Sequence, residues 1–109
     1  MEIQEMISSI KDIEFNNDIR NEKIINNGKK AVIEILQENE DFFNNNNKNV
    51  YKFLENQEFM DDYYIRNLDK YVPIKGFSLA WSKYFSLLQE VFNQCFFMIR
   101  ADIENILYN

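Results

Sequence analysis

The stretch FSLAWSKYFSLLQEVFNQCFFMIRADIENIL, residues 77–107, runs for 31 residues without a glycine or a proline. Large side chains recur in it at alternating spacings of four and three residues, which is the period of one face of an α-helix. Two neighbouring stripes result: Phe77, Trp81, Tyr84, Leu88, Val91, Cys95, Met98 and Asp102 form the first, and Phe85, Phe92, Phe96, Ile99, Ile103 and Ile106 form the second. A helix with two adjacent apolar stripes is buried over most of its circumference. The stretch therefore predicts a long C-terminal helix, about 77–107, as the central element of an all-α fold.

The middle of this helix, VFNQCFFMIR, is its most apolar part, but it is too short to cross a membrane. The uncharged run between Glu90 and Arg100 has nine residues, whereas a spanning helix needs about 20. One side of this part of the helix can still bind a second chain. We expect a possible oligomer face to include Phe92, Phe96 and Phe97, with Phe97 off both stripes and directed at another helix or another chain.

The composition predicts one all-α domain over residues 1–109. Of all residues, 46 % are hydrophobic, which is enough for a core, and only two are glycine and one is proline. Sheet proteins need turn residues at short intervals, whereas helices need few. We expect a compact bundle of five to six helices, which cover residues 2–14, 19–28, a helix from Lys29 onward, 48–58, a short piece over 61–68, and the long helix after a connector at 71–76.

The stretch IINNGKKAVIEILQEN, residues 24–39, resembles the turn of a HEAT-type helical pair. It contains an apolar helix end, Gly28, a basic residue and a second apolar helix. Glycine readily adopts the left-handed conformation that closes a helix. The resemblance implies an αα-hairpin with its turn at Gly28, and it implies no function.

Residues 41–49 are polar and rich in asparagine, which predicts a loop. Four asparagines follow one another at 44–47, in a chain with sixteen asparagines in all. Such a composition is typical of an AT-rich genome, so we interpret this run as drift in a loop. We expect Phe42 and Phe43 to be tucked under the loop.

Acidic residues are concentrated in the middle of the chain. The net charge is −6, and residues 34–62 hold eight acidic and two basic residues. Residues three or four apart share a helix face, and aromatic side chains lie among the carboxylates. Carboxylates speed encounter with a basic protein, and tyrosine is common at interface hot spots. The predicted partner-binding residues are Glu34, Glu38, Glu55, Glu58, Asp61, Asp62, Tyr63 and Tyr64; simple solvated helix faces are the alternative.

The motif Asp61-Asp62-Tyr63-Tyr64 resembles, over four residues, the acidic surface with a tyrosine pair in colicin-type nuclease immunity proteins. The resemblance implies that these residues bind a basic nuclease.

Several kinds of chemistry are missing from the sequence. The absence of histidine excludes Ser-His and Cys-His nucleophiles and nearly all zinc and di-iron sites. The single cysteine, Cys95, lies in an apolar helix, where we expect a buried and inert thiol. Two isolated glycines make no phosphate loop, and Lys29-Lys30 is no basic stripe for nucleic acid. We therefore expect no catalytic residue, no cofactor and no metal, and an enzyme that uses carboxylates alone is the weakest hypothesis.

Two functional hypotheses remain. The first is a small acidic inhibitor, not an enzyme, that occludes a basic, nucleic-acid-handling protein, as a toxin immunity protein, an antitoxin or a phage anti-defence protein does. The second is a structural or assembly protein that homodimerises or docks through its C-terminal helix. The acidic start of the chain and its lone cysteine favour the cytoplasm, and we expect no direct contact with nucleic acid or membrane.

Overall fold

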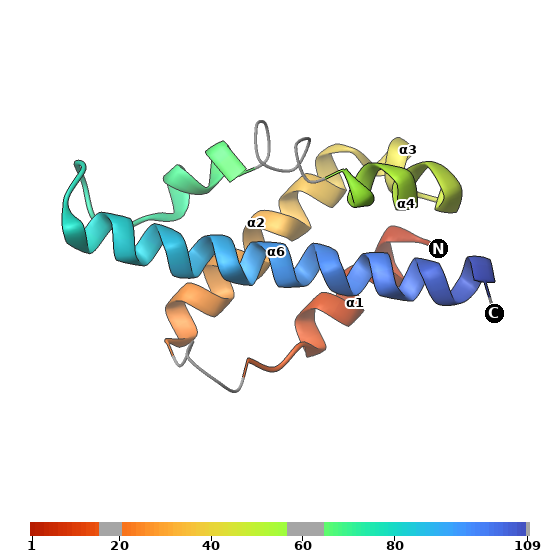
Figure 1. Ribbon diagram of the computed structural model, residues 1–109, viewed down its shortest axis with the longest axis horizontal. Coiled ribbons are helices and arrows are strands. Elements are labelled where there is room, and N and C mark those ends of the chain that lie inside the picture. The colour runs from red at the N-terminus through yellow and green to blue at the C-terminus, as the bar shows by residue number, and fades with distance from the viewer. Residues whose placement is uncertain (16–20, 57–64, 109) are drawn as a thin grey trace.

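The central element of the fold is α6, Leu79–Tyr108, a helix of 30 residues. In the computed structural model, which describes residues 1–15, 21–56 and 65–108, it runs along the longest axis of the molecule (Figure 1). The other elements are α1 (Ile3–Asp12), α2 (Glu22–Glu38), α3 (Glu40–Phe43), α4 (Asn47–Glu55) and the 3-10 helix η2 (Ile65–Tyr71), and no strand occurs in the described ranges. The predicted all-α fold with a long C-terminal helix is thus confirmed.

The helix α6 is covered by different elements along its length. Figure 1 shows α2 crossing it obliquely near its middle, η2 beside its N-terminal half, and α1, α3 and α4 around its C-terminal half. Its fully covered side chains belong to the two predicted stripes: Leu88, Val91, Phe92, Cys95, Phe96, Ile99 and Ile103. None of its residues before Leu88 is buried. Among the described helices, none has the length and apolar composition needed to cross a membrane.

The start of α6 is capped by Ser78, whose Oγ accepts a hydrogen bond from the Trp81 amide at 3.1 Å. A serine at this position satisfies one of the amides that a helix leaves unpaired at its N-terminus. The helix can therefore begin beyond the core, where little tertiary contact supports it.

The prediction of two helices that meet at Gly28 is wrong. The helix α2 is continuous over 17 residues and is capped by Asn21, which accepts from the amides of Lys23 and Ile24. Gly28 is buried in its middle, and a Cβ built there would lie 2.5 Å from Cγ1 of Val91 on α6. Glycine stands at this position because the two helices cross too closely for a side chain, and it does not end a helix.

The prediction of a loop over 41–49 is wrong except at residues 44–46, because 41–43 belong to α3 and 47–49 belong to α4. The asparagines of this stretch have structural roles. Asn44 Oδ1 accepts from the Ile3 amide at 2.7 Å, so it caps α1 from a distant part of the chain. Asn45 has φ 59°, a conformation that asparagine tolerates better than most residues. Asn46 donates through Nδ2 to the carbonyls of Asp41 and Phe42 in α3, and Asn47 Oδ1 accepts from the Met1 amino group at 2.6 Å. The interpretation of this run as drift is therefore wrong.

Other boundaries differ from the predictions by a few residues. The first helix covers 3–12 and not 2–14, and the helix predicted over 48–58 covers 47–55. The short helix predicted over 61–68 is a 3-10 helix over 65–71 in its described part, since residues 57–64 lie outside the described ranges, as do residues 16–20. Phe43 is buried as expected, whereas Phe42 is 37 % exposed.

We predict that Gly28→Ala destabilises the protein even though alanine is the better helix former. Overpacking typically costs about 1–3 kcal/mol, and the gain in helix propensity returns up to about 1 kcal/mol. The free energy of unfolding, measured in urea, should therefore fall by about 1–2 kcal/mol. Asn26→Ala, on the exposed side of the same helix, is the control and should cause no loss. In a double-mutant cycle, Val91→Ala should relieve part of the Gly28→Ala defect; independent effects would contradict the close crossing.

We predict that Asn44→Ala lowers the free energy of unfolding by about 1 kcal/mol, because the Ile3 amide loses its cap. Asn44→Asp keeps an acceptor oxygen and should retain most of the stability. Asn49→Ala, at an exposed position of α4, is the matched control. Equal stability of Asn44→Ala and Asn49→Ala would show that the cap contributes nothing.

Candidate binding surfaces

The first predicted acidic residue, Glu34, is engaged within the protein. The Tyr71 hydroxyl donates a hydrogen bond to Glu34 Oε2, and Lys70 Nζ lies 3.3 Å from the same oxygen. The hydrogen bond from Tyr71 and the charge of Lys70 hold the pKa of Glu34 below its ordinary value, although partial burial opposes this. Burial and the same hydrogen bond raise the pKa of Tyr71. Glu34 is therefore a local contact between α2 and η2.

Asn27 extends this contact to α6. Its Nδ2 donates to the Tyr71 carbonyl and to the Tyr84 hydroxyl, both at 3.2 Å. These bonds join α2, η2 and the N-terminal half of α6. Glu38, the second predicted residue, is exposed near the end of α2 and lies on the same side as Glu34 by its spacing.

The third predicted residue, Glu55, belongs to an acidic and aromatic cluster that the sequence analysis did not find. The Tyr51 hydroxyl donates to Glu104 Oε1 at 3.3 Å, and the rings of Tyr51 and Tyr108 are 5.9 Å apart in an edge-to-face arrangement. Desolvation and the nearby carboxylates of Glu104 and Glu55 raise the pKa of Tyr51. We call Tyr51, Glu55, Glu104 and Tyr108 the acidic end. The four-residue spacing of Glu104 and Tyr108 on the predicted helix is the sequence signal that could have indicated it.

The remaining five predicted partner-binding residues lie outside the described ranges. They are Glu58, Asp61, Asp62, Tyr63 and Tyr64. Their role in binding stays a prediction.

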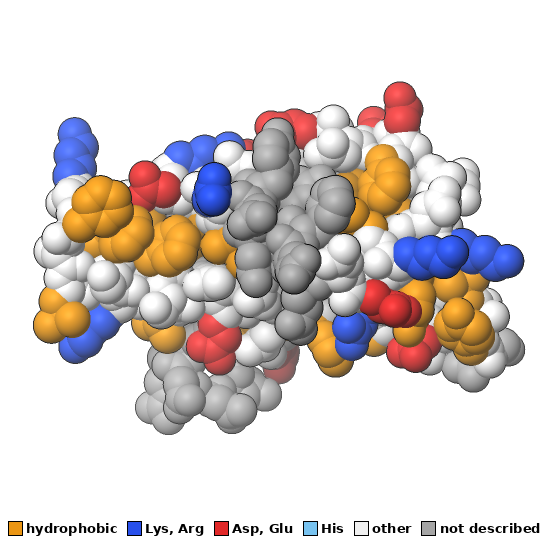
Figure 2. Space-filling model, turned by 45° about the horizontal axis from the view of Figure 1, so that its top comes forward, with side chains coloured by type: hydrophobic (Ala, Val, Ile, Leu, Met, Phe, Trp, Pro, Cys, Tyr) orange, Lys and Arg blue, Asp and Glu red, His pale blue; other side chains and the backbone are white. Residues whose placement is uncertain are grey.

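Three aromatic side chains form a row at the start of α6, of which Phe77 is exposed and Trp81 and Phe85 are half-buried. Phe77 is 91 % exposed, and its ring lies 4.9 Å from that of Trp81, which stacks at 5.0 Å on Phe85. Trp81 Nε1 donates to Asp69 of η2 at 3.1 Å, which places η2 beside this row. We call Phe77, Trp81 and Phe85 the aromatic edge. Figure 2 shows hydrophobic side chains gathered at the left end of the molecule, with both basic and acidic side chains beside them.

The sequence placed the aromatic edge on the apolar stripes of the long helix, and its spacing was predicted correctly. The exposure of Phe77 was not predicted, because the pattern does not reveal how far the other helices cover this end of α6. Leu79, on the opposite side of the helix, is 73 % exposed as well. The first turns of α6 thus extend beyond the core.

The expected oligomer face does not form one surface. Phe92 and Phe96 are covered by the chain itself, with 0 % and 1 % exposure, so they belong to the core. Phe97 is 61 % exposed, and its ring lies 4.5 Å from the Arg100 guanidinium carbon of the same helix. Of the three residues, only Phe97 is available to another chain.

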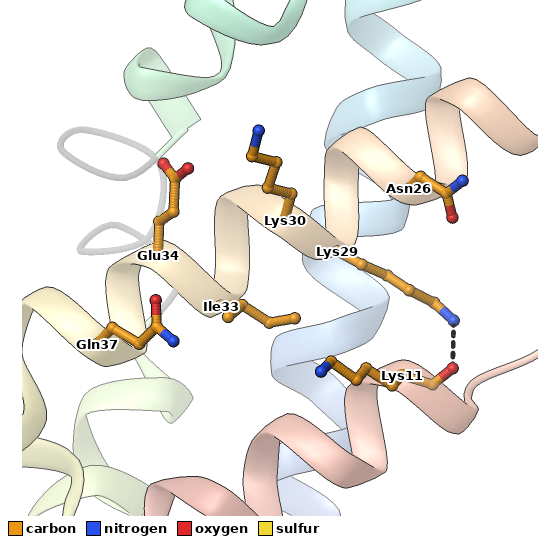
Figure 3. A pocket seen from close by; sticks show the side chains of 7 residues that line it. All are labelled: Lys11, Asn26, Lys29, Lys30, Ile33, Glu34 and Gln37. Carbon is orange, nitrogen blue, oxygen red and sulfur yellow. Dashed lines mark hydrogen bonds between the residues drawn. The ribbon is translucent and has the colours of Figure 1, made fainter.

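A pocket of about 380 Å³ lies between the end of α1 and α2 and contains three lysines. Figure 3 shows Lys29 reaching from α2 to the end of α1, while Lys30 and Glu34 point to another side of α2. Lys29 Nζ donates to the carbonyls of Lys11 at 2.9 Å and of Ile13 at 2.7 Å. A cation at a helix C-terminus stabilises the unpaired carbonyls there, so Lys29 has a structural role in this pocket.

No arrangement for catalysis is seen in the part of the chain that the structure describes. Its His, Cys, Asp and Glu residues form no group of three that could hold a metal ion. Cys95 is fully covered, and burial raises the pKa of its thiol to about 12. A thiol with so high a pKa is not a nucleophile near neutral pH.

Comparison of the chain with protein families, with curated proteins and with solved structures finds no match.

We predict that Tyr71→Phe destabilises the protein near neutral pH and that the loss shrinks in acid. The hydrogen bond to a partly exposed carboxylate should contribute about 1 kcal/mol. The folded-state pKa of Glu34 is lowered from 4.5, so this stability is present above pH 4.5 and is lost as the pH falls through the lowered value. Urea unfolding of wild type and variant at a series of pH values tests this.

Tyr51→Phe is the matched control for this experiment. Its hydroxyl also donates to a carboxylate, that of Glu104, but in an exposed place. Its effect should be smaller. A loss at Tyr71 that is independent of pH would show that the hydroxyl acts through packing and not through the Glu34 charge.

Proposed function

We propose that this protein is a non-enzymatic assembly protein that docks on another protein surface through the start of α6. The observation that carries the proposal is the 91 % exposure of Phe77 in a row with Trp81 and Phe85. Fully burying a side chain such as phenylalanine contributes about 1.5–3 kcal/mol. The fold of the chain itself leaves this gain unused at Phe77, whereas a partner surface would obtain it.

The spacing of the aromatic edge suits recognition by a groove. Trp81 and Phe85 are four residues apart, so they project from one side of α6. Phe77 lies two residues before the helix and continues this row through its ring contact with Trp81. Helices that dock in grooves use anchors at such spacings, and tryptophan is among the residues enriched at interface hot spots.

The edge is also held in place before any partner arrives. The Ser78 cap fixes the first turn, and the hydrogen bond from Trp81 to Asp69 fixes the indole. A side chain that is already ordered loses less conformational entropy on binding. This favours a docking role over the alternative that these aromatics are incidental surface residues.

A second candidate function is the acidic inhibitor of a basic, nucleic-acid-handling protein. It is supported by the acidic end, where two tyrosines from α4 and α6 lie among the carboxylates Glu55 and Glu104. In this function the carboxylates would pair with basic side chains of the partner, and the tyrosines would supply most of the buried area.

One experiment separates the two functions. A photoreactive benzoylphenylalanine is placed at position 77 in one variant, at 108 in a second and at 97 in a control, in cells that naturally contain the protein. If the chain docks through α6, the variant at 77 forms an adduct that mass spectrometry maps to one defined segment of one protein. The acidic inhibitor predicts such an adduct at 108, with a basic protein. Equal, scattered labelling from all three positions would contradict both functions.

A further inference from the structure

The charges of the protein are separated along α6. The half around its start, residues 22–30 and 65–90, has seven basic and three acidic residues and a net charge of +4. The half around its end, residues 1–12, 31–56 and 91–108, has ten acidic and four basic residues and a net charge of −6. Within these described ranges, basic side chains thus outnumber acidic ones around the start of α6, and acidic side chains outnumber basic ones around its end.

Exposed apolar and aromatic side chains occur in both halves, at the two ends of α6. The basic half carries the aromatic edge, with Phe77 91 % exposed and the exposed Lys75 two residues before it. The acidic end carries Tyr108, 70 % exposed, beside the exposed Glu104. The two ends of one molecule therefore match in polarity and are opposite in charge.

We propose that the aromatic edge of one copy docks on the acidic end of a second copy, so that copies associate head to tail. This rests on the proposed docking role of the start of α6, and it names the surface on which it docks. Phe77 packs against Tyr108 of the second copy, and Lys75 approaches Glu55 and Glu104 of that copy.

The same charges disfavour a symmetric dimer. In a two-fold dimer through the aromatic edge, each surface meets its own duplicate. The exposed Lys75 of one copy would then lie near that of the other, and two acidic ends would repel each other likewise. Such pairs of like charges act against the wrong pairing, whereas opposite charges favour the unlike ends.

The size of the molecule bounds the strength of this contact. Its extents are 44 × 27 × 20 Å, so an end offers a small area. The contact would bury at most about 1,200 Å² in total, the low limit for specific interfaces. Association should therefore be weak, with a dissociation constant in the range of about 10–100 µM.

The dependence on salt follows from the distances between charges. At physiological salt, screening acts over about 8 Å, so the net charges of two copies, whose centres lie much farther apart, repel only weakly. Opposite charges that come within this distance across the contact still attract each other. Raising the salt from about 0.15 M to about 0.5 M should weaken association severalfold.

The test uses two variants at exposed positions, in which the fold should be kept. Lys75→Ser with Phe77→Ser blocks the aromatic edge, and Glu104→Gln with Tyr108→Ser blocks the acidic end. All four changes remove contacts without adding a charge, so the altered surfaces do not attract each other. Circular dichroism and urea unfolding check the fold of both.

Sedimentation of the purified proteins from about 5 to about 300 µM, around the expected dissociation constant, gives the result. Wild type should grow beyond a dimer as its concentration rises, whereas each variant alone should stay a monomer. An equimolar mixture of the two variants should form a one-to-one dimer and no larger species, because one intact edge meets one intact acidic end. The emission of Trp81, the one tryptophan of the chain, should shift with association.

Phe97→Ser is the control, because Phe97 is an exposed phenylalanine away from both ends of α6. It should leave association unchanged. The proposal is overturned if wild type stays a monomer throughout, if it stops at a dimer that the mixture of variants does not restore, or if Phe97→Ser abolishes association. A monomer that still forms a defined adduct from position 77 with another protein would overturn self-docking and leave the proposed function standing.

Discussion

The close crossing of α2 and α6 at Gly28 and Val91 is the constraint on which the rest of the structure depends. Because Gly28 has no side chain, the side chain of Val91 packs directly on the backbone of α2, and Leu88 is buried beside it. The crossing is oblique, and it leaves two sectors around α6 (Figure 1). In one sector η2 is held by Glu34 and Asn27, and in the other α1, α3 and α4 complete the core.

The sequence predicts the helices better than their contacts. The stripes of α6 are a local property, so its length and the side that faces the core follow from spacing, whereas the number of stripe residues that are covered does not. Gly28 shows the limit of prediction from local sequence, because glycine can either end a helix or permit a close helix crossing. Only Val91, far away in the sequence, decides between these two roles. The asparagines at 44–47 present the same difficulty, since their partners include Met1 and Ile3. Composition indicated a loop, and the tertiary contacts made it a set of helix caps.

Tertiary contacts also decide which of the acidic residues are engaged within the protein. Glu34 and Glu38 look equivalent in the sequence, but Tyr71 and Lys70 engage only the first, whereas the second is exposed. Glu55 keeps an acidic environment because the fold brings Glu104 to the same tyrosine. A count of charges along the chain places all of the net charge in its middle, whereas the fold separates a basic from an acidic half. Over the residues that the structure describes, this separation of charge is thus a property of the helix packing.

The position of α6 at the end of the fold has a consequence for synthesis. The elements α1 to α4 and η2 all leave the ribosome before the helix against which they pack. Their apolar faces, such as that of Met6 and Ile10 in α1, have no complete core to join until α6 follows. Long-range contacts of this kind slow folding and expose apolar surface in the meantime. The apolar surface of the nascent chain should therefore stay accessible to chaperones and proteases until α6 has emerged.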